Sequence, residues 1–441
     1  MSKFKFIMAA DPQYEWGPDK DDSVGMGSGG EWKGLPGITK ENCWYYSDYS
    51  VLAKKQVESM NKLIAANPDI VGVMFNGDLV DYNEWKSVAE DMDLDGFKEI
   101  YSKIQKPMYC GLGNHDYDMN VDDSGDQLPP SDMVDFLISN IEANNVTNKD
   151  FLCVDSYEGA SLCRTITGSL SYSFDIYNVH FVQLNNYPGF TVDWSSYISR
   201  YARRYRVTIK DCYDWLKADL NKARNEGKAI IVCQHQLWFD SDNQNIASIR
   251  EKYINLYNEY GVSAVFVGHE HKYFGAVRNY KNLKCPAFYC GATSQCNYIL
   301  IEVDSETCKL KVQGVSSLDG NIEYVTEVAE IALNTETGTG EIINPPGFVT
   351  FFSEGGYTVE FTLKYKENGT TVEKKTGRML LGNKTTYDLP AGASDYEVSC
   401  LAWNGSSWKE KFDTYKSDTP FNCTFRTYGA LPNPKMEIIY D

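Results

Sequence analysis

The feature that most restricts the fold of this chain is a series of short apolar runs, each followed at once by Asp, Asn or His. The clearest is Val265-Phe-Val-Gly-His-Glu-His271, where an apolar run and a glycine precede two histidines separated by one residue. The run is typical of a buried strand, and a tight backbone after it can aim both imidazoles at neighbouring points, as a two-metal centre requires. Alone, the motif is equally compatible with a polar turn.

The same pattern, an apolar strand-like run followed at once by a polar residue, occurs four times earlier in the chain. Stretches with helical spacing separate them, over 50–66, 97–104, 211–225 and 246–260, so we predict a layered α/β arrangement. The carboxyl ends of strands in such a sheet converge on one cleft. Carboxylate, amide and imidazole groups suit a pair of divalent ions, with Asp78 placed to bridge them. The side chains predicted to meet are Asp11, Gln13, Asp78, Asn114, His115, His235, His269 and His271.

Two domains are expected, because 441 residues exceed what one hydrophobic core usually supports. We predict that the first covers 1–318, with loop-rich insertions at 14–50 and about 117–165. Residues 319–347 have linker composition, with a Thr- and Gly-rich stretch followed by Asn344-Pro-Pro-Gly347. Residues 348–441 alternate as strands around an Asn368-Gly369 turn and predict an all-β module.

The charge of the chain restricts its partners. A net charge of −19 argues against nucleic acid and against simple electrostatic adhesion to anionic lipid. No apolar run reaches the roughly 18 residues that a spanning helix needs. We expect a soluble monomer, cytoplasmic as the sequence stands or secreted if a leader has been removed. In an oxidising compartment Cys153 and Cys163, or members of the group Cys285, Cys290 and Cys296, could pair.

Two other polar features have competing interpretations. His180 lies inside a predicted strand, so we expect it to be structural. Residues 197–206 form a basic patch interleaved with tyrosines. This patch is either a solvated surface or a wall of the substrate cleft that faces phosphate.

Taken together, the strand-end motifs resemble the calcineurin-like metallophosphoesterases. That family reads D-x-H, G-D-x-x-D, G-N-H-[DE], a later His, and G-H-x-H. The segments Tyr172-Ser-Phe-Asp and Val179-His-Phe-Val also look like the purple acid phosphatase side of the superfamily. The corresponding motifs in this chain are Asp11-Pro-Gln13, Gly77-Asp-Leu-Val-Asp81, Gly113-Asn-His-Asp116, His235 and Gly268-His-Glu-His271.

This resemblance implies a four-layer αββα sandwich that holds two divalent metal ions, Mn, Fe, Mg or Zn. His115 would contact the phosphoryl oxygen or protonate the leaving group, with Asp116 or Asp118 nearby to orient it. A metal-activated hydroxide would attack phosphorus in line. One ion would be held by Asp11, Gln13, Asp78 and His271, and the other by Asp78, Asn114, His235 and His269.

Gln13 departs from the family pattern, which usually has His at this position. An Asp-Pro-Gln start is similar to a branch that includes a cytosolic protein phosphatase, so the change does not itself signal inactivity. An amide oxygen is a harder and weaker ligand than imidazole. We therefore expect Mn²⁺, Fe or Mg²⁺ to be favoured over Zn²⁺ at that site.

The C-terminal module resembles the membrane-binding β-sandwich of thiol-activated, cholesterol-dependent cytolysins. The similar segments are Gly355-Gly-Tyr-Thr-Val-Glu-Phe361, Cys400-Leu-Ala-Trp403 and Arg426-Thr-Tyr-Gly-Ala-Leu431. The resemblance implies a membrane surface as a partner, contacted through Trp403, Trp408 and Leu431. The tryptophan-rich loop is altered, however, and Ala430-Leu431 stands where that family has a Thr-Leu pair.

Three functions are compatible with these patterns. The first is a dinuclear-metal-dependent phosphoesterase, specifically a phosphodiesterase acting on a lipid or membrane-associated substrate such as sphingomyelin. The second is a cytosolic phosphomonoesterase or protein phosphatase with a structural β-module. The third is a lipid-binding protein whose metal centre is structural, and the full ligand set together with His115 argues against it.

Overall fold

The structure is a computed structural model with two compact units. One comprises Met1–Cys212 and Glu226–Thr337, and the other comprises Tyr213–Asn225 and Gly338–Asp441. Each unit is considered by itself. The described residues are 3–14, 49–81, 93–116, 128–198, 202–238, 244–275, 277–278, 282–295, 297–318, 321–335, 347–367, 369–390, 393–403, 408–410, 412, 414–417, 422–431 and 433–440.

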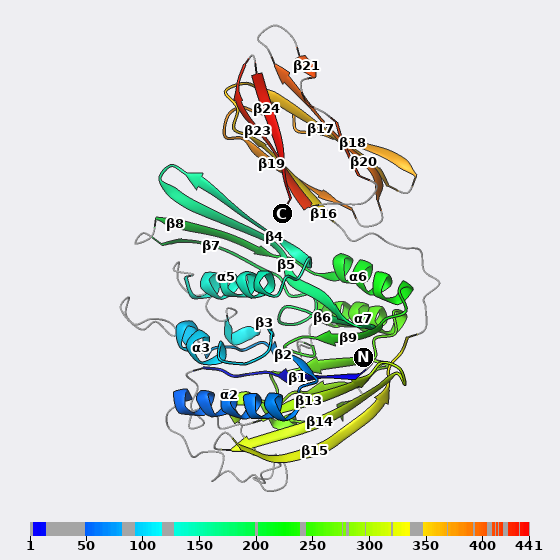
Figure 1. Ribbon diagram of the computed structural model, residues 1–441. Coiled ribbons are helices and arrows are strands. Elements are labelled where there is room, and N and C mark those ends of the chain that lie inside the picture. Colours follow the sequence, from blue (N-terminus) through cyan, green and yellow to red (C-terminus); the bar gives the residue numbers. More distant parts are fainter. Residues whose placement is uncertain are drawn as a thin grey trace. The chain divides into compact units, whose positions relative to one another are not determined.

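In the first unit, the described strands form two sheets that pack face to face (Figure 1). The first sheet has the order β15-β14-β13-β1-β2-β3 and the second β11-β12-β10-β9-β6-β5-β8-β7, with β4 paired to β5. The strands of the first are β1 (Lys3–Ala9), β2 (Ile70–Asn76), β3 (Met108–Gly111), β13 (Asn297–Asp304), β14 (Lys309–Leu318) and β15 (Asn321–Ala332). Those of the second are β4 (Asn148–Glu158), β5 (Ser161–Ile176), β6 (Val179–Gln183), β7 (Val192–Ile198), β8 (Arg203–Ile209), β9 (Ala229–Cys233), β10 (Ala264–Val267), β11 (Val277–Arg278) and β12 (Ala287–Tyr289).

Strand β1 shows why the chain forms layers. Phe4, Phe6 and Met8 face the core between the two sheets, where Phe6 stacks on Phe181 of the second sheet. The alternate residues Ile7 and Ala9 face the helical side. A run that is apolar on both faces is therefore buried between two layers, as parallel strands require.

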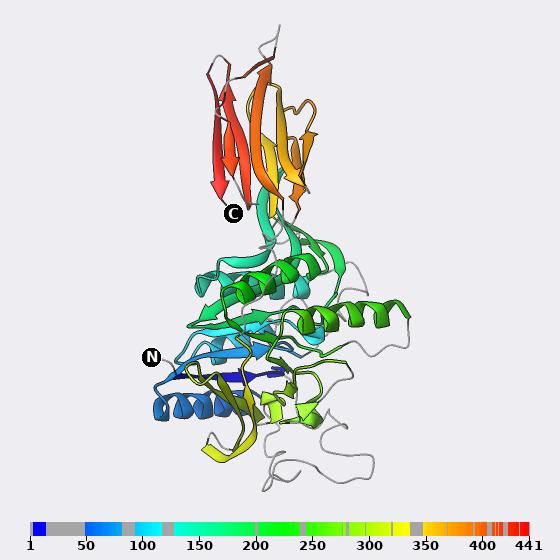
Figure 2. The ribbon, with the colours of Figure 1, turned by 90° about the vertical axis from the view of Figure 1, so that its right-hand side faces the viewer.

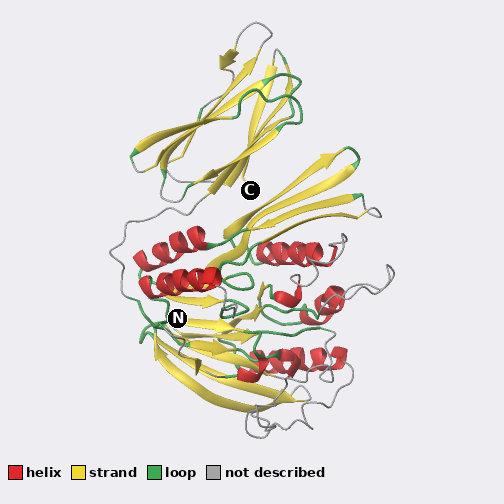
Figure 3. Ribbon diagram, turned by 180° about the vertical axis from the view of Figure 1, so that it is seen from behind, coloured by secondary structure: helices red, strands yellow, loops and turns green. Residues whose placement is uncertain are grey.

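Helices cover the outer faces of the sheets (Figures 2 and 3). Helix α2 packs on β14 and β15, because its apolar residues recur every three or four positions, as at Val57, Met60 and Ile64. The predicted four-layer αββα fold is confirmed. The described helices of this unit are α2 (Tyr49–Ala66), α3 (Asp93–Tyr101), α5 (Leu128–Ala143) and α7 (Gln244–Glu259), with short 3₁₀ turns η3 (His271–Tyr273) and η4 (Thr293–Gln295); α6 (Tyr213–Asn225) belongs to the second unit.

Two sequence-based boundaries need correction. The predicted linker 319–347 contains β15, which pairs antiparallel with β14 through its whole length and ends the first sheet. The predicted loop-rich insertion 117–165 contains α5, β4 and the start of β5. In α5 the buried Met133, Val134, Leu137 and Ile138 do have helical spacing. The polar composition around both segments concealed regular structure.

The C-terminal module of the second unit is a β-sandwich, as predicted. Its two sheets have the orders β19-β16-β23-β24 and β18-β17-β20-β21, with β22 paired to β20. Along β17, Val359, Phe361, Leu363 and Tyr365 alternate into the core. The strands are β16 (Gly347–Ser353), β17 (Val359–Glu367), β18 (Thr370–Lys375), β19 (Lys384–Leu389), β20 (Ser394–Trp403), β21 (Trp408–Glu410), β22 (Tyr415–Ser417), β23 (Asn422–Ala430) and β24 (Asn433–Tyr440).

The cysteines and helices bear on two earlier expectations. Cys153 stands opposite Ile166 and Cys163 opposite Ser156 in the β4–β5 ladder, so the two thiols are not paired, and both are free. The possible Cys153–Cys163 pairing is therefore wrong. Cys285 and Cys290 are free as well, and Cys296 lies outside the described residues. Among the residues that the structure describes, no helix is both long and apolar enough to cross a membrane.

Candidate metal centre

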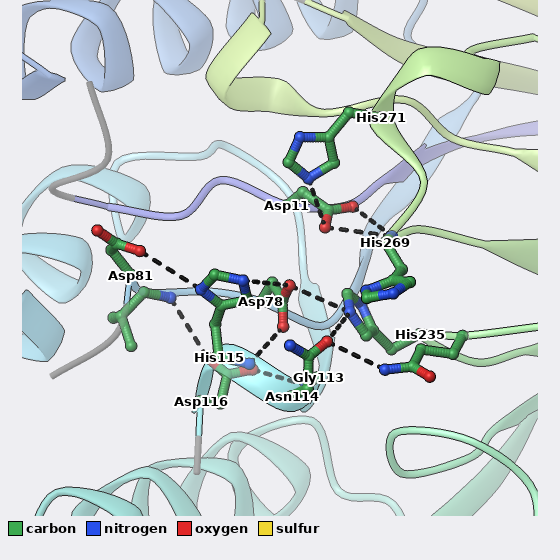
Figure 4. Close-up of polar contacts among 12 residues, drawn as sticks. Asp11, Asp78, Asp81, Gly113, Asn114, His115, Asp116, His235, His269 and His271 are labelled. Carbon is green, nitrogen blue, oxygen red and sulfur yellow. Dashed lines mark hydrogen bonds and ion pairs between the residues drawn. The ribbon is translucent and has the colours of Figure 1, made fainter. Parts of the chain in front are cut away.

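The predicted polar residues come together at the carboxyl ends of strands from both sheets (Figure 4). Strands β1, β2 and β3 are parallel neighbours, and so are β9 and β10 in the facing sheet. Their ends therefore meet across the inter-sheet core. The carboxylates Asp11 and Asp78 are buried, and so is His235. The cluster consists of Asp11, Gln13, Asp78, Asn114, His115, His235, His269 and His271.

Two glycines allow these loops to approach one another. A Cβ on Gly268 would lie 2.4 Å from Asp11 Oδ2, and a Cβ on Gly113 would lie 2.2 Å from Asp78 Oδ1. Real Cβ atoms do not come that close to other atoms. The glycines of the Gly-His-x-His and Gly-Asn-His motifs are therefore required by the carboxylates packed against them.

Four non-glycine residues of the centre have left-handed backbones. Their φ angles are 51° at Asp11, 39° at Gln13, 52° at Asp78 and 66° at His269. Such conformations cost free energy and persist only where neighbouring contacts enforce them. Here the backbone N–H of His269 donates to both carboxylate oxygens of Asp11, at 3.2 and 3.0 Å. The backbone N–H of Gln13 donates to the backbone carbonyl of Asp78 at 2.9 Å. The strain is concentrated where side chains are aimed inward.

Around Asp78 the donor atoms have the spacing of a coordination shell. His235 Nε2 lies 3.1 Å from Asp78 Oδ2 and 3.1 Å from Asn114 Oδ1. Neighbouring ligands of an ion with bonds of about 2.1 Å are separated by roughly 3 Å. Asp78, His235 and His269 together form a group that could hold a metal ion. These residues fit a divalent cation.

A backbone hydrogen bond fixes which nitrogen of His235 faces the centre. Its Nδ1 lies 2.8 Å from the Asn76 carbonyl oxygen, to which only a protonated Nδ1 can donate. In the neutral ring this leaves the Nε2 lone pair directed at Asp78. Burial lowers the pKa of His235, but the Asp78 carboxylate outweighs it and raises the pKa to about 9, so the Nε2 proton must leave when a cation binds.

The second half of the centre contains Asp11, Gln13 and His271. His271 Nε2 lies 3.1 Å from Asp11 Oδ1. Gln13 is buried, and its Oε1 has no hydrogen-bond partner among the described residues. A buried amide oxygen without a donor calls for an explanation, and a cation supplies one. A cation held by Asp11 and His271 would give this oxygen a partner, as the sequence predicts for Gln13.

His115 lies at the edge of the centre between two carboxylates. Its Nδ1 is 3.4 Å from Asp81 Oδ1 and its Nε2 is 3.8 Å from Asp78 Oδ2. Burial lowers the pKa of His115, whereas Asp78 and Asp81 raise it more, so the net shift is upward. Asp81 thus orients the ring, a role that its place in the Gly-Asp-x-x-Asp motif could have suggested.

Asp116 has surroundings different from those expected of a catalytic residue. Its carboxylate accepts backbone N–H groups from Leu79 at 2.8 Å, Val80 at 3.3 Å and Gly113 at 2.8 Å. Burial and the charge of Asp78 raise its pKa to about 7. The residue ties the loop after β2 to the loop after β3. Asp118, the other proposed partner of His115, lies outside the described residues.

Two remaining polar features are accounted for by local pairing. His180 Nδ1 lies 2.8 Å from Asp175 Oδ1 on the adjacent strand, so its predicted structural role is confirmed. In the basic patch, Arg203 pairs with Asp135 at 3.2 Å, and Arg206 pairs with Glu158. These pairs neutralise part of the charge that could have faced phosphate.

Comparison with known proteins agrees with this geometry. A family model described as calcineurin-like phosphoesterase matches residues 46–273. Purple acid phosphatase 22 of Arabidopsis thaliana is 32% identical over 129 residues, which cover 28% of this chain and 25% of that protein. The chain thus spans about a quarter of the length of this curated relative.

Two solved structures are similar to separate parts of the chain. One is a dimetal phosphatase from Danio rerio, with a TM-score of 0.41, 11% identity, and coverage of 74% of this chain and 99% of that one. The other is the membrane-binding domain of pneumolysin, with a TM-score of 0.18, 17% identity, and coverage of 22% of this chain and 97% of that one.

Proposed function

This chain belongs to the calcineurin-like phosphoesterases, and on that premise we propose that it hydrolyses phosphate esters with two divalent metal ions. The observation that supports this most directly is the donor group of Asp78, His235 and His269, which is joined to Asp11 and His271 through the backbone N–H of His269. When bound, two such ions supply Lewis acidity that activates water and neutralises phosphoryl oxygens. The oxygen ligands Gln13 and Asn114 favour Mn²⁺, Fe or Mg²⁺.

The protein's own groups would complete the reaction. Asp81 beside Nδ1 holds the His115 ring so that Nε2 faces Asp78. A proton on that nitrogen is placed to pass to the departing alkoxide, which would otherwise leave as a strong base. His115 is therefore the general acid of this proposal, and Asp81 positions it.

Activity on small esters provides the first test. The full-length protein with Mn²⁺ should hydrolyse p-nitrophenyl phosphate or bis(p-nitrophenyl) phosphate, and the preferred compound separates monoesterase from diesterase. The Asp78→Asn variant should lose this turnover, because both metal sites share that carboxylate. Absence of metal-dependent turnover for both esters in the wild-type protein would contradict the proposal.

A lipid surface is the proposed location of the substrate, and the distal end of the C-terminal sandwich supports this. We define the distal end as the 380–383 turn, Trp403 and the Ala430-Leu431 turn. Strand pairing puts Lys384 opposite Phe352 and Thr427 opposite Ser353, so both turns lie at the end where β16 finishes. This end is opposite the strand termini Gly347 and Tyr440, where the chain enters and leaves the sandwich.

Exposed apolar side chains gather at this distal end. Leu380 is 59% exposed, Leu381 67% and Leu431 38%, and they are the exposed large hydrophobic residues of the sandwich among those described. Arg378 lies 5.9 Å from the Trp403 ring, and Lys384 is exposed beside the turn. Leucines surrounded by cations and an aromatic ring suit the boundary between headgroups and acyl chains. The side chain of Trp408 lies outside the description.

Vesicle binding tests this second part. The full-length protein should sediment with vesicles of phosphatidylcholine, phosphatidylserine and sphingomyelin, and the double variant Leu380→Asp/Leu381→Asp should not. Ile249→Asp, at a residue 36% exposed on α7, is the matched control and should still bind. If wild-type protein fails to sediment, or all three proteins bind equally, the membrane proposal is wrong. A phosphatase with a structural β-module then becomes the better description.

A further inference from the structure

Gln236 lies beside the metal centre although no motif includes it. It is only 7% exposed, and its Nε2 donates to Asn114 Oδ1 at 3.1 Å. The same oxygen lies 3.1 Å from His235 Nε2. An amide oxygen has two lone pairs, so Asn114 can accept this hydrogen bond and still present the other lone pair to a metal ion.

Gln236 is itself held in place from behind. Its backbone N–H donates to the backbone carbonyl of Asn186 at 3.1 Å. Its backbone carbonyl accepts a hydrogen bond from Gln234 Nε2 at 2.7 Å. Gln234 Oε1 in turn accepts one from the Tyr257 hydroxyl of α7 at 2.8 Å. Gln234 and Tyr257 are almost completely buried. These hydrogen bonds therefore hold the Gln236 backbone, from which its side chain reaches Asn114.

The Nε2 donor of Gln236 affects which atom of the Asn114 side-chain amide faces the centre. Rotation about the terminal bond of Asn is broad and roughly two-fold, so the side chain could equally present Nδ2. An NH₂ group cannot bind a cation. In that orientation Nδ2 would also oppose the Gln236 NH₂ group, and a buried donor would lose its acceptor. The Gln236 donor therefore favours the orientation in which Oδ1 is a ligand.

We infer that Gln236 is a positioning residue that fixes the Asn114 oxygen toward the metal ion shared with Asp78, His235 and His269. Gln234 and Tyr257 support it in this role. The inference rests on the proposed function, because it requires that the centre binds two metal ions. It predicts a selective effect, since Asn114 belongs to only one of the two donor sets.

Metal binding rather than turnover is the primary measurement. Full-length protein is stripped with a chelator and titrated with Mn²⁺, followed by calorimetry and by electron paramagnetic resonance. Gln236→Met removes the N–H donor at similar length and should weaken one of two Mn²⁺ sites by about 10–100-fold, while the other keeps its affinity. The resonance signal of coupled Mn²⁺ pairs should then give way to that of single ions.

Control variants separate positioning from general damage. Gln56→Met removes another buried side-chain amide, on α2, whose Oε1 accepts a hydrogen bond from Ser317 Oγ at 3.2 Å. This variant should leave both Mn²⁺ affinities unchanged. Gln236→Asn keeps an amide but is one methylene too short to reach Asn114. It should therefore reproduce the selective loss even if Gln236→Met folds poorly. Thermal unfolding of each metal-free variant reports its folding.

The outcomes distinguish the inference from the proposed function. If the wild-type protein binds two Mn²⁺ ions and both Gln236 variants keep both affinities, the positioning role is wrong and the proposed function stands. Equal loss at both sites, or the same loss in Gln56→Met, also overturns the positioning role. If the wild-type protein binds no Mn²⁺, the proposed function and the inference fail together.

Discussion

At the scale of single residues, the centre depends on backbone positions that other residues tolerate poorly. Asp11, Gln13, Asp78 and His269 have positive φ, and Gly268 lies against the Asp11 carboxylate. Loops with such backbones bring donor atoms that follow several strands close enough together to bind the same ion. A methyl group in the wrong place should therefore disturb metal binding more than folding.

Gly268→Ala tests this directly. The new Cβ would meet Asp11 Oδ2 at 2.4 Å, so the carboxylate must leave its present position. We expect Mn²⁺ affinity to fall by about 10–100-fold, measured by titration calorimetry. Gly356→Ala, whose Cβ would have its nearest contact at 3.8 Å, is the control. Unchanged affinity in Gly268→Ala would show that the loop adjusts freely.

His115→Ala tests the role of the general acid. The variant should retain both metal ions but lose turnover by roughly 100-fold or more toward alkyl esters, whose leaving groups need a proton. The loss toward nitrophenyl esters should be smaller, because nitrophenolate leaves unaided. Equal losses for the two ester types would argue against an acid role. Asp81→Asn should show the same selectivity with a smaller effect.

At the scale of elements, carboxyl groups that lose part of their hydration within a sheet carry a cost in stability. Asp150 in β4 illustrates this, because burial raises its pKa to about 6 despite a hydrogen bond from Ser169. The unfolded chain releases this proton near pH 4. The protonated carboxyl therefore stabilises the fold below about pH 4, and this contribution is lost as the pH rises to about 6.

Asp150→Asn should consequently stabilise the protein at neutral pH. A pKa that differs by about two between the folded and unfolded chain corresponds to roughly 3 kcal/mol. The variant should gain this free energy of unfolding above pH 6. At pH 4 the two proteins should differ little. Urea unfolding of both at pH 4 and pH 7.5 measures this difference. A gain that is the same at both pH values would mean that ionisation is not its cause.

At the scale of the whole molecule, metal binding and folding should be coupled in one unit only. The donor atoms come from loops after five strands of both sheets in the first unit, so bound ions connect those sheets. The sandwich core of Val359, Phe361 and Val398 has no part in the centre. A ligand present at 100 times its Kd stabilises the folded state by about 2.7 kcal/mol.

Differential scanning calorimetry with and without a chelator checks this coupling. Chelation should lower the unfolding temperature of one transition and leave the other in place. Val398→Ala should lower the other transition, which identifies it as the sandwich. If the chelator shifts both transitions equally, the two units unfold together and the expectation is wrong.

The amino-acid sequence by itself determined the strand-end design, the order of the metal-ligand motifs and the β-rich C-terminal module. These follow from hydrophobic periodicity and short spacings, which are local properties of the chain. Only the tertiary structure decided that Asp81 rather than Asp116 lies against His115, that β15 completes a sheet, and that Gln236 contacts Asn114. Gln236 and Asn114 are 122 positions apart, and such contacts depend on how the two sheets pack. No local sequence pattern predicts a contact between residues so far apart in the chain.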